Sequence, residues 1–125
     1  MARRKSPYLT DAELRLMEVL WEKKSATVAD VAQGASGEAP LAYSSVLTIL
    51  RILESKGHVR YTKEGRAFLY HPVLERGEAC QKAVTHLVRR FFQGSPELLV
   101  LNLIESGKIS RAELKRLRSR IEEEK

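Results

Sequence analysis

The amino-acid sequence predicts a mainly α-helical protein with a small β-hairpin: a winged helix-turn-helix followed by a C-terminal helical dimerisation region. Three observations predict this fold class. Apolar residues recur at helical spacing within residues 41–55, Gly57 follows as a helix-ending residue, and two short alternating segments then flank a turn before Pro72. Helical periodicity returns afterwards, so we expect a winged-helix DNA-binding domain at residues 1–73 and a helical dimerisation region at residues 74–125.

Length and composition restrict the class of protein. With 125 residues the chain can form one compact domain, or a small domain with an oligomerisation segment. Its start carries no signal-peptide pattern, and no run approaches the roughly 18 apolar residues of a membrane span. Cys80 is the single cysteine, which excludes an intramolecular disulfide and fits a reducing compartment. We therefore expect a cytoplasmic protein without membrane insertion.

Positive charge is concentrated in one part of the sequence. The formal net charge of the chain is +6. Within residues 41–66, five cations stand against two carboxylates, which leaves a net charge of +3 on about a fifth of the chain. The five cations are Arg51, Lys56, Arg60, Lys63 and Arg66. A basic segment of this density favours a polyanionic partner such as nucleic acid.

Two short helices are expected first, at residues 10–22 and 27–34. Thr10 followed by Glu13 is a capping-box pattern, and Thr27 is a good N-cap for the second helix. Residues 23–26 are interpreted as a plain connection. The expected core residues are Ala12, Leu16, Val19, Leu20, Val28, Val31 and Ala32, with Met17 and Trp21 on a neighbouring apolar edge. Trp21 is expected to fill the core rather than to stack on a base.

Residues 41–55 are expected to form the recognition helix. Its apolar face consists of Val46, Ile49, Leu50 and Leu53, and another face carries Ser44, Thr48, Arg51 and Ser55. Small side chains let a helix lie deep in the major groove, and an arginine can bond O6 and N7 of guanine together. Residues 35–40 form the turn before this helix. Residues 1–7 are expected to be a frayed basic terminus, with an arm that contacts DNA as the alternative.

A β-hairpin wing should follow the recognition helix. We expect strands at residues 58–62 and 67–70, joined by a turn at residues 63–66. Lys63 and Arg66 then lie at the tip, where they can reach phosphates beside the groove.

The C-terminal third has the pattern of three more helices, at about residues 74–92, 96–104 and 110–121. Ser110 with Glu113 makes another capping box, and residues 98–104 are apolar nearly all round. About fifty residues of this kind cannot close a satisfactory core alone. A symmetric dimer would give their apolar faces something to pack against.

Three stretches of the sequence resemble the penicillinase-repressor family of winged-helix transcriptional regulators (the BlaI/MecI type, with the copper-responsive CopY type beside it). They are LTDAELRLMEVLWEKKSATVADV, YSSVLTILRILESKGHVRYTKEGRAFLYHPV and FFQGSPELLVLNLIE. The resemblance extends over almost the whole chain from Leu9 on. It implies a homodimer that binds an inverted-repeat operator in double-stranded DNA and represses transcription.

The resemblance also implies roles for particular residues. It places Tyr43, Ser44, Ser45, Thr48, Arg51, Lys63 and Arg66 at the DNA. The dimerisation residues we expect are Leu87, Phe91, Leu98, Leu101, Leu103, Ile104, Leu114 and Leu117. Many members of the family carry arginine at the place of Ile52, so either the base preference or one phosphate contact is left open by this departure. The tail lacks the paired cysteines of the copper-responsive members, so copper sensing of that kind is not expected.

Control by proteolysis is a further implication of the resemblance. In antibiotic-responsive members, a membrane sensor protease triggers cleavage next to an asparagine that matches Asn102, followed here by Leu103. An ordinary polar residue on a helix is the favoured interpretation of Asn102, and a regulated cleavage site is the alternative.

Other function classes find little support in the sequence. No catalytic Ser/His/Asp or Cys/His spacing and no phosphate-binding glycine loop occur, so we expect no enzyme and no cofactor. Cys80 and His86 fall on different faces of one helix, and His58 with His71 would make an incomplete metal site, so we expect no metal. A winged-helix protein-interaction module without sequence-specific DNA binding stays open as the alternative function.

Overall fold

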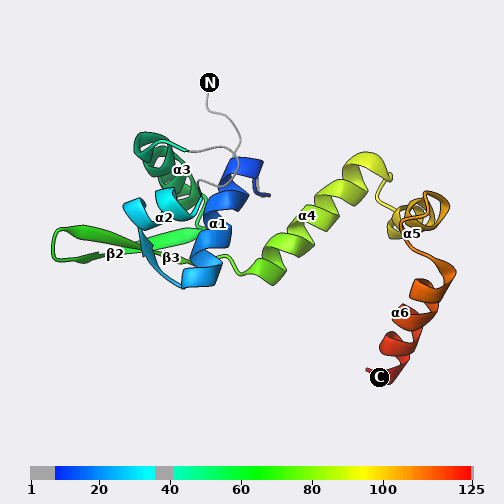
Figure 1. Ribbon diagram of the computed structural model, residues 1–125. Coiled ribbons are helices and arrows are strands. Elements are labelled where there is room, and N and C mark those ends of the chain that lie inside the picture. The colour runs from blue at the N-terminus through cyan, green and yellow to red at the C-terminus, as the bar shows by residue number, and fades with distance from the viewer. Residues whose placement is uncertain (1–7, 36–40, 125) are drawn as a thin grey trace. The chain divides into compact units, whose positions relative to one another are not determined.

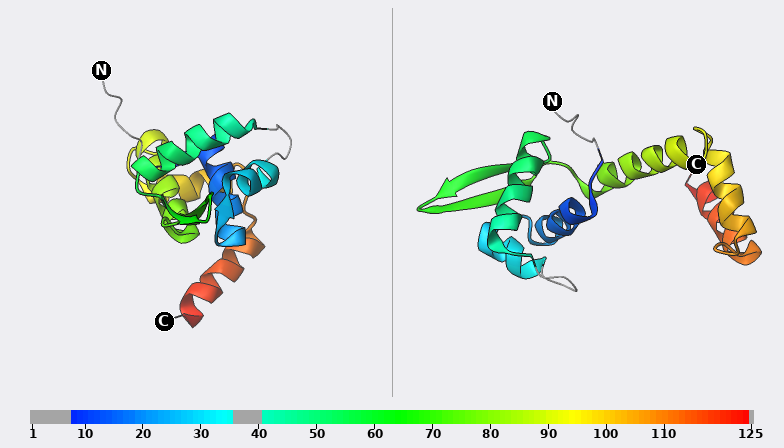
Figure 2. Two further views of the ribbon diagram at one scale, coloured as in Figure 1. Left: turned by 90° about the vertical axis from the view of Figure 1, so that its left-hand side faces the viewer. Right: turned by 90° about the horizontal axis from the view of Figure 1, so that it is seen from above.

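The computed structural model describes residues 8–35 and 41–124, and it is mainly helical with one small sheet (Figures 1 and 2). Its elements, in chain order, are α1 (Asp11–Lys23), β1 (Ala26–Thr27), α2 (Val28–Gly34), α3 (Tyr43–Ser55), β2 (Val59–Glu64), β3 (Ala67–Pro72), α4 (Arg76–Phe91), α5 (Pro96–Glu105) and α6 (Arg111–Glu123). The predicted basic terminus and most of the predicted turn before α3 lie outside the described residues. None of the described helices is long and apolar enough to cross a membrane.

Contacts between residues divide the chain into two compact units. The first is residues 1–83 and the second is residues 84–125, so the border falls inside α4. The expected domain boundary between residues 73 and 74 concerns independent folding and stays a prediction.

The helix starts follow the predicted capping chemistry. The Thr10 hydroxyl accepts from the Glu13 backbone N–H at 3.2 Å, and the Glu13 carboxylate accepts from the Thr10 N–H at 2.8 Å. Ser110 and Glu113 form the second predicted capping box at the start of α6. The cap at Thr27 also proves to be a reciprocal box, with Asp30 as its partner.

The sheet has three antiparallel strands in the order β1-β3-β2, and its β2–β3 hairpin projects beyond the helices as the wing (Figures 1 and 2). Two expectations were wrong here. Ala26, the last residue of the segment interpreted as a plain connection, belongs to β1 and pairs with Tyr70. A strand of two residues is too short to show alternation. The turn is tighter than expected, because Glu64 pairs with Ala67 and Gly65 supplies the positive φ, 62°, that such turns need. Lys63 is therefore a strand residue.

The core of the first unit lies between α1, α2, α3 and the sheet. Its largest fully buried side chains are Leu16, Met17, Leu20, Val31, Val46, Leu50 and Leu53. Met17 was expected at the edge and instead lies at the centre, because its unbranched side chain can fill an irregular gap. Trp21 is half-buried against this core, and its Nε1 donates to the Leu74 carbonyl oxygen at 2.8 Å, which ties the chain after β3 to α1.

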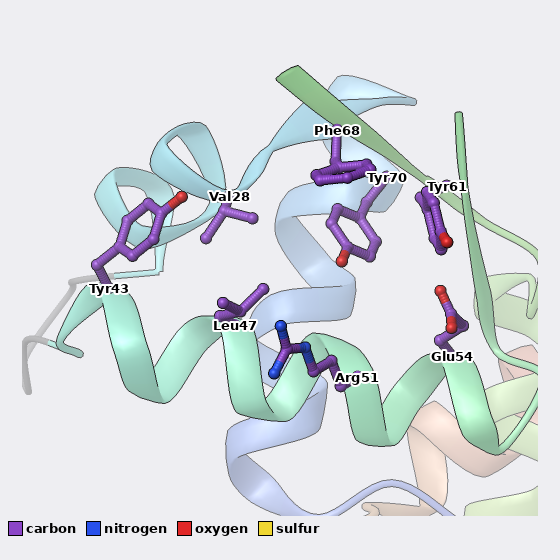
Figure 3. Close-up of a pocket in the computed structure, with 8 residues that line it drawn as sticks. All are labelled: Val28, Tyr43, Leu47, Arg51, Glu54, Tyr61, Phe68 and Tyr70. Atoms are coloured by element: carbon purple, nitrogen blue, oxygen red, sulfur yellow. The ribbon is translucent and has the colours of Figure 1, made fainter. Parts of the chain in front are cut away.

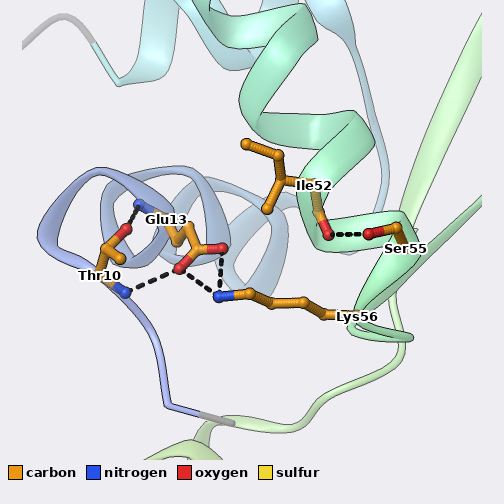
Figure 4. Close-up of polar contacts among 5 residues, drawn as sticks. All are labelled: Thr10, Glu13, Ile52, Ser55 and Lys56. Atoms are coloured by element: carbon orange, nitrogen blue, oxygen red, sulfur yellow. Dashed lines mark hydrogen bonds and ion pairs between the residues drawn. The ribbon is translucent and has the colours of Figure 1, made fainter. Parts of the chain in front are cut away.

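A buried ion pair joins the end of α3 to the start of α1 (Figure 4). Lys56 Nζ lies 2.8 Å from one carboxylate oxygen of Glu13 and donates to the other at 2.9 Å. Both side chains are less than a tenth exposed, at 7 % and 4 %. Burial raises the pKa of Glu13, but the hydrogen bonds from Lys56 and Thr10 lower it by more, so the net pKa lies below its ordinary value.

The second unit is built differently, because its apolar side chains stay accessible. Val88 is the one buried residue among those described from 84 to 124. α5 and α6 contain no buried residue, although α5 is apolar over most of its surface as predicted. This unit therefore lacks a closed core of its own.

We expect Glu13→Gln to lower the free energy of unfolding by about 3–5 kcal/mol, since it leaves the buried Lys56 charge without a partner. Glu18→Gln, at an exposed position of the same helix, should change it by no more than about 0.5 kcal/mol. Chemical denaturation at neutral pH measures both changes.

The same pair predicts a pH dependence. The pKa of Glu13 is lowered in the folded state, so its contribution is present above the unfolded pKa of about 4.3 and is lost as the pH falls through the folded value. The stability difference between wild type and Glu13→Gln should shrink below about pH 4. A difference that stays constant on acidification would contradict this account.

Candidate nucleic-acid interface

α3 turns one face into the core and the opposite face outward. Val46, Leu50 and Leu53 are buried, and this fixes the rotation of the helix. All five predicted DNA-contacting residues of α3 are exposed as a result: Tyr43, Ser44, Ser45, Thr48 and Arg51. Ile52 and Ser55 are exposed beside them.

The hydroxyls on this face lie close to the helix backbone. Thr48 Oγ1 donates to the Ser44 carbonyl oxygen at 3.0 Å, and Ser55 Oγ donates to the Ile52 carbonyl oxygen at 3.2 Å. Both hydroxyl protons are therefore used within the helix. The side chains on this face therefore project only a short way from the helix backbone, and such a helix can approach a groove closely.

The wing carries cations and aromatic rings on the same face. Lys63 pairs with Phe68 across the hairpin, and Tyr61 pairs with Tyr70, so all four side chains share one face of the ribbon. The Tyr61 and Phe68 rings meet edge to face at 5.3 Å, and Lys63 Nζ lies 6.0 Å from the Phe68 ring centre. Arg66 is exposed in the turn itself. The two predicted wing cations thus remain accessible, Lys63 one step back from the tip.

A cleft of about 540 Å³ separates α3 from this face of the wing (Figure 3). Tyr61, Phe68 and Tyr70 line it from the sheet, and Val28 closes it from α2. Its wall on α3 consists of Tyr43, Leu47, Arg51 and Glu54. Arg51 therefore lies on the wing side of α3, where Figure 3 shows its guanidinium between Leu47 and Glu54.

The aromatic wall of this cleft was missed by the sequence analysis. Tyr61, Phe68 and Tyr70 were identified only as strand residues, although the period-two alternation of the hairpin was enough to place them on one face. Burial raises the pKa of the Tyr70 phenol, and the nearby Glu54 carboxylate raises it further. The phenol is therefore neutral at physiological pH.

The histidines and the cysteine do not form a metal centre. No group of three or more His, Cys, Asp or Glu side chains that could hold a metal exists among the described residues. His71 Nε2 pairs with Thr62 Oγ1 at 2.9 Å. His58 is buried just before β2, where burial, with Lys82 and Lys56 nearby, lowers its pKa.

The predicted dimerisation residues belong to the second unit. Leu87 and Phe91 are exposed on α4, Leu98 and Leu101 on α5, and Leu114 and Leu117 on α6. Leu103 and Ile104 on α5 are half-buried. Asn102, the candidate cleavage position, is exposed in α5.

Comparison with known proteins gives one consistent family. The family model described as "Penicillinase repressor" matches residues 9–123. The chain is 30 % identical over 122 residues to the "Penicillinase repressor" of Bacillus licheniformis, and the match covers 98 % of this chain and 95 % of that protein.

Two solved structures resemble about three fifths of the chain. One is the solution structure of the DNA-binding domain of the repressor BlaI, with a TM-score of 0.52, 32 % identity, and coverage of 61 % of this chain and 93 % of that one. The other is the monomeric form of Bacillus licheniformis BlaI in complex with the blaP half-operator. It gives a TM-score of 0.50, 28 % identity, and coverage of 62 % and 93 %. The predicted winged-helix fold is confirmed.

We expect Arg51→Ala to change which duplex sequences are preferred, and Lys63→Ala to weaken all sequences alike. A base-edge contact carries roughly 1–3 kcal/mol of discrimination, whereas a phosphate contact mainly changes the salt slope, by about one unit. Selection from a random duplex library and salt titration of binding measure the two effects.

Lys115→Ala, which removes the same charge from the exposed surface of α6, is the control and should change neither quantity. An altered base preference in Lys63→Ala, with none in Arg51→Ala, would reverse the roles assigned to helix and wing.

Proposed function

Because the chain belongs to the penicillinase repressor family, we propose that it is a DNA-binding transcriptional repressor that binds an inverted-repeat operator as a homodimer. The observation that carries the proposal is the exposed face of α3, with its short polar side chains, beside a basic wing. The solved relative bound to a half-operator supports it, since that structure is 28 % identical and resembles 62 % of this chain. The relatives are named as repressors, in agreement with the expectation that the chain is not an enzyme.

In this proposal α3 enters the major groove and the wing follows the adjacent backbone. Arg51 reads a base edge together with the hydroxyl-bearing Ser44, Ser45 and Thr48. Tyr43, at the first turn of α3, accompanies them. Lys63 and Arg66 contact phosphates and set the position of the wing without reading sequence. The cleft between α3 and the wing gives a DNA strand room to pass.

The accessible apolar faces of the second unit support dimerisation. Phe91 is 65 % exposed and Leu117 is 44 % exposed, and similar side chains line α5. Where exposed apolar side chains of this size gather on one surface, they mark an interaction site in a stable protein. A second copy of the chain offers the same surface, as a two-fold symmetric interface requires. Two linked half-site binders then gain affinity that neither has alone.

Relief by proteolysis is the finer part of the proposal. Asn102 is exposed in α5, and a cut between Asn102 and Leu103 would separate α6 from the rest of the chain. With α6 the chain loses Leu114, Leu117 and Ile121. Each such side chain is worth about 1.5–3 kcal/mol when buried in an interface, so the monomer–dimer equilibrium would shift by several powers of ten. A membrane sensor protease is the class of partner that this control would need.

The function is tested by combining Phe91→Asp with Leu117→Asp in the full chain. We expect wild type to sediment as a dimer and to bind an inverted repeat in a salt-sensitive way, and the double variant to sediment as a monomer with half-site affinity. Thr85→Asp with Ser119→Asp places the same charge on exposed polar positions of α4 and α6, and should behave as wild type. A wild-type chain that binds no duplex at low salt would instead support the protein-interaction alternative.

Control is tested by ending the chain after Asn102. The truncated protein should keep the circular dichroism of a folded first unit and lose operator binding at concentrations that saturate the full chain. A chain that ends after Ile121 keeps the apolar residues of α6 and is the matched control. Undiminished binding by the shorter protein would show that α6 is not the control point.

A further inference from the structure

Ile52 is a large apolar side chain on the outward face of α3. It is 44 % exposed, whereas the residues around it on this face are short and polar. Thr48 lies one turn before it and Ser55 one turn after it. Single exposed apolar residues are common on protein surfaces and need no explanation by themselves. The surroundings of Ile52 are what give it a role.

Within one helical turn of Ile52 on this flank of α3, the described residues offer no free cation. The nearest basic neighbour there is Lys56, one turn on, and the Nζ of Lys56 is held by both carboxylate oxygens of Glu13. Figure 4 shows Lys56 extended towards Glu13 and Thr10 instead of outward beside Ile52. Arg51, the exposed cation of the helix, lines the cleft on the wing side.

The polar groups near Ile52 are also limited. The hydroxyl protons of Thr48 and Ser55 go to backbone carbonyl oxygens within α3. Among the described neighbours of Ile52 on this flank, none therefore offers a long free donor for a guanine edge or a phosphate. Among the groups that base pairs present in the major groove, the 5-methyl group of thymine is the apolar one.

We propose that Ile52 is a specificity-determining residue that contacts the 5-methyl group of a thymine in each operator half-site. This inference rests on the proposed function, because it assumes that α3 enters the major groove. It gives the two flanks of the helix different chemistry: Arg51 reads hydrogen-bond acceptors on the wing side, and Ile52 reads a methyl group on the side of α1.

The test removes the methyl group and nothing else. An operator is first selected from a random duplex library with the full chain, and each thymine is then replaced singly by deoxyuridine. We expect one position per half-site at which wild type loses about three- to fourfold in affinity, the value of one buried methyl group. Ile52→Ala should bind that operator more weakly and show no loss at that position.

Val73→Ala provides the control, because Val73 is a similarly exposed β-branched residue outside α3 and should keep the full deoxyuridine effect. The inference is overturned if no thymine position is sensitive, or if Ile52→Ala keeps the sensitivity. A library that yields no enriched sequence gives a different result: it overturns the proposed function, and this inference with it.

Discussion

One buried carboxylate anchors the end of α3 against α1. Glu13 caps α1 by accepting from the Thr10 N–H, and the same carboxylate holds the ammonium group of Lys56 at the end of α3. The two helices are thereby tied at a single point. Charges withdrawn from water this far are tolerated only in one geometry, because each carries a desolvation cost that its partner must offset. A rotated α3 would leave both charges unpaired, so the pair reinforces the orientation that the buried Val46, Leu50 and Leu53 set.

The two units differ in how much of their apolar surface is buried. The first has a closed core of fully buried side chains from three helices, whereas the second buries Val88 alone among its described residues. A unit without a core of its own gains its stability from whatever it packs against. In the proposed repressor, the second unit is stable only when it packs against the second copy of the chain. A regulatory cut in this unit would therefore abolish dimerisation. The reading surface on α3 can then stay intact while operator affinity is lost.

Local patterns predicted most of the fold, and long-range contacts account for what was missed. The capping boxes at Thr10 and Ser110 follow from residues three apart, and the helical stripes follow from a period that each helix shows by itself. The pairing of Ala26 with Tyr70 and the contact of Glu13 with Lys56 join residues 44 and 43 positions apart. No local period marks such partners. Glu13 is instructive, because its capping role was predicted while its burial against Lys56 was not.

The contact between Glu13 and Lys56 also determines which cation remains on the exposed face of α3. Read as sequence, α3 offers two cations near its end, Arg51 and Lys56, and both count towards a basic patch. In the folded chain only Arg51 remains available, because Glu13 neutralises Lys56 and draws it against α1. Non-specific attraction to phosphates falls with each cation removed, whereas contacts to base edges are unaffected. In the proposed complex, the ion pair would therefore lower non-specific affinity without removing a base contact, and Ile52 would be the side chain presented on the flank nearest α1.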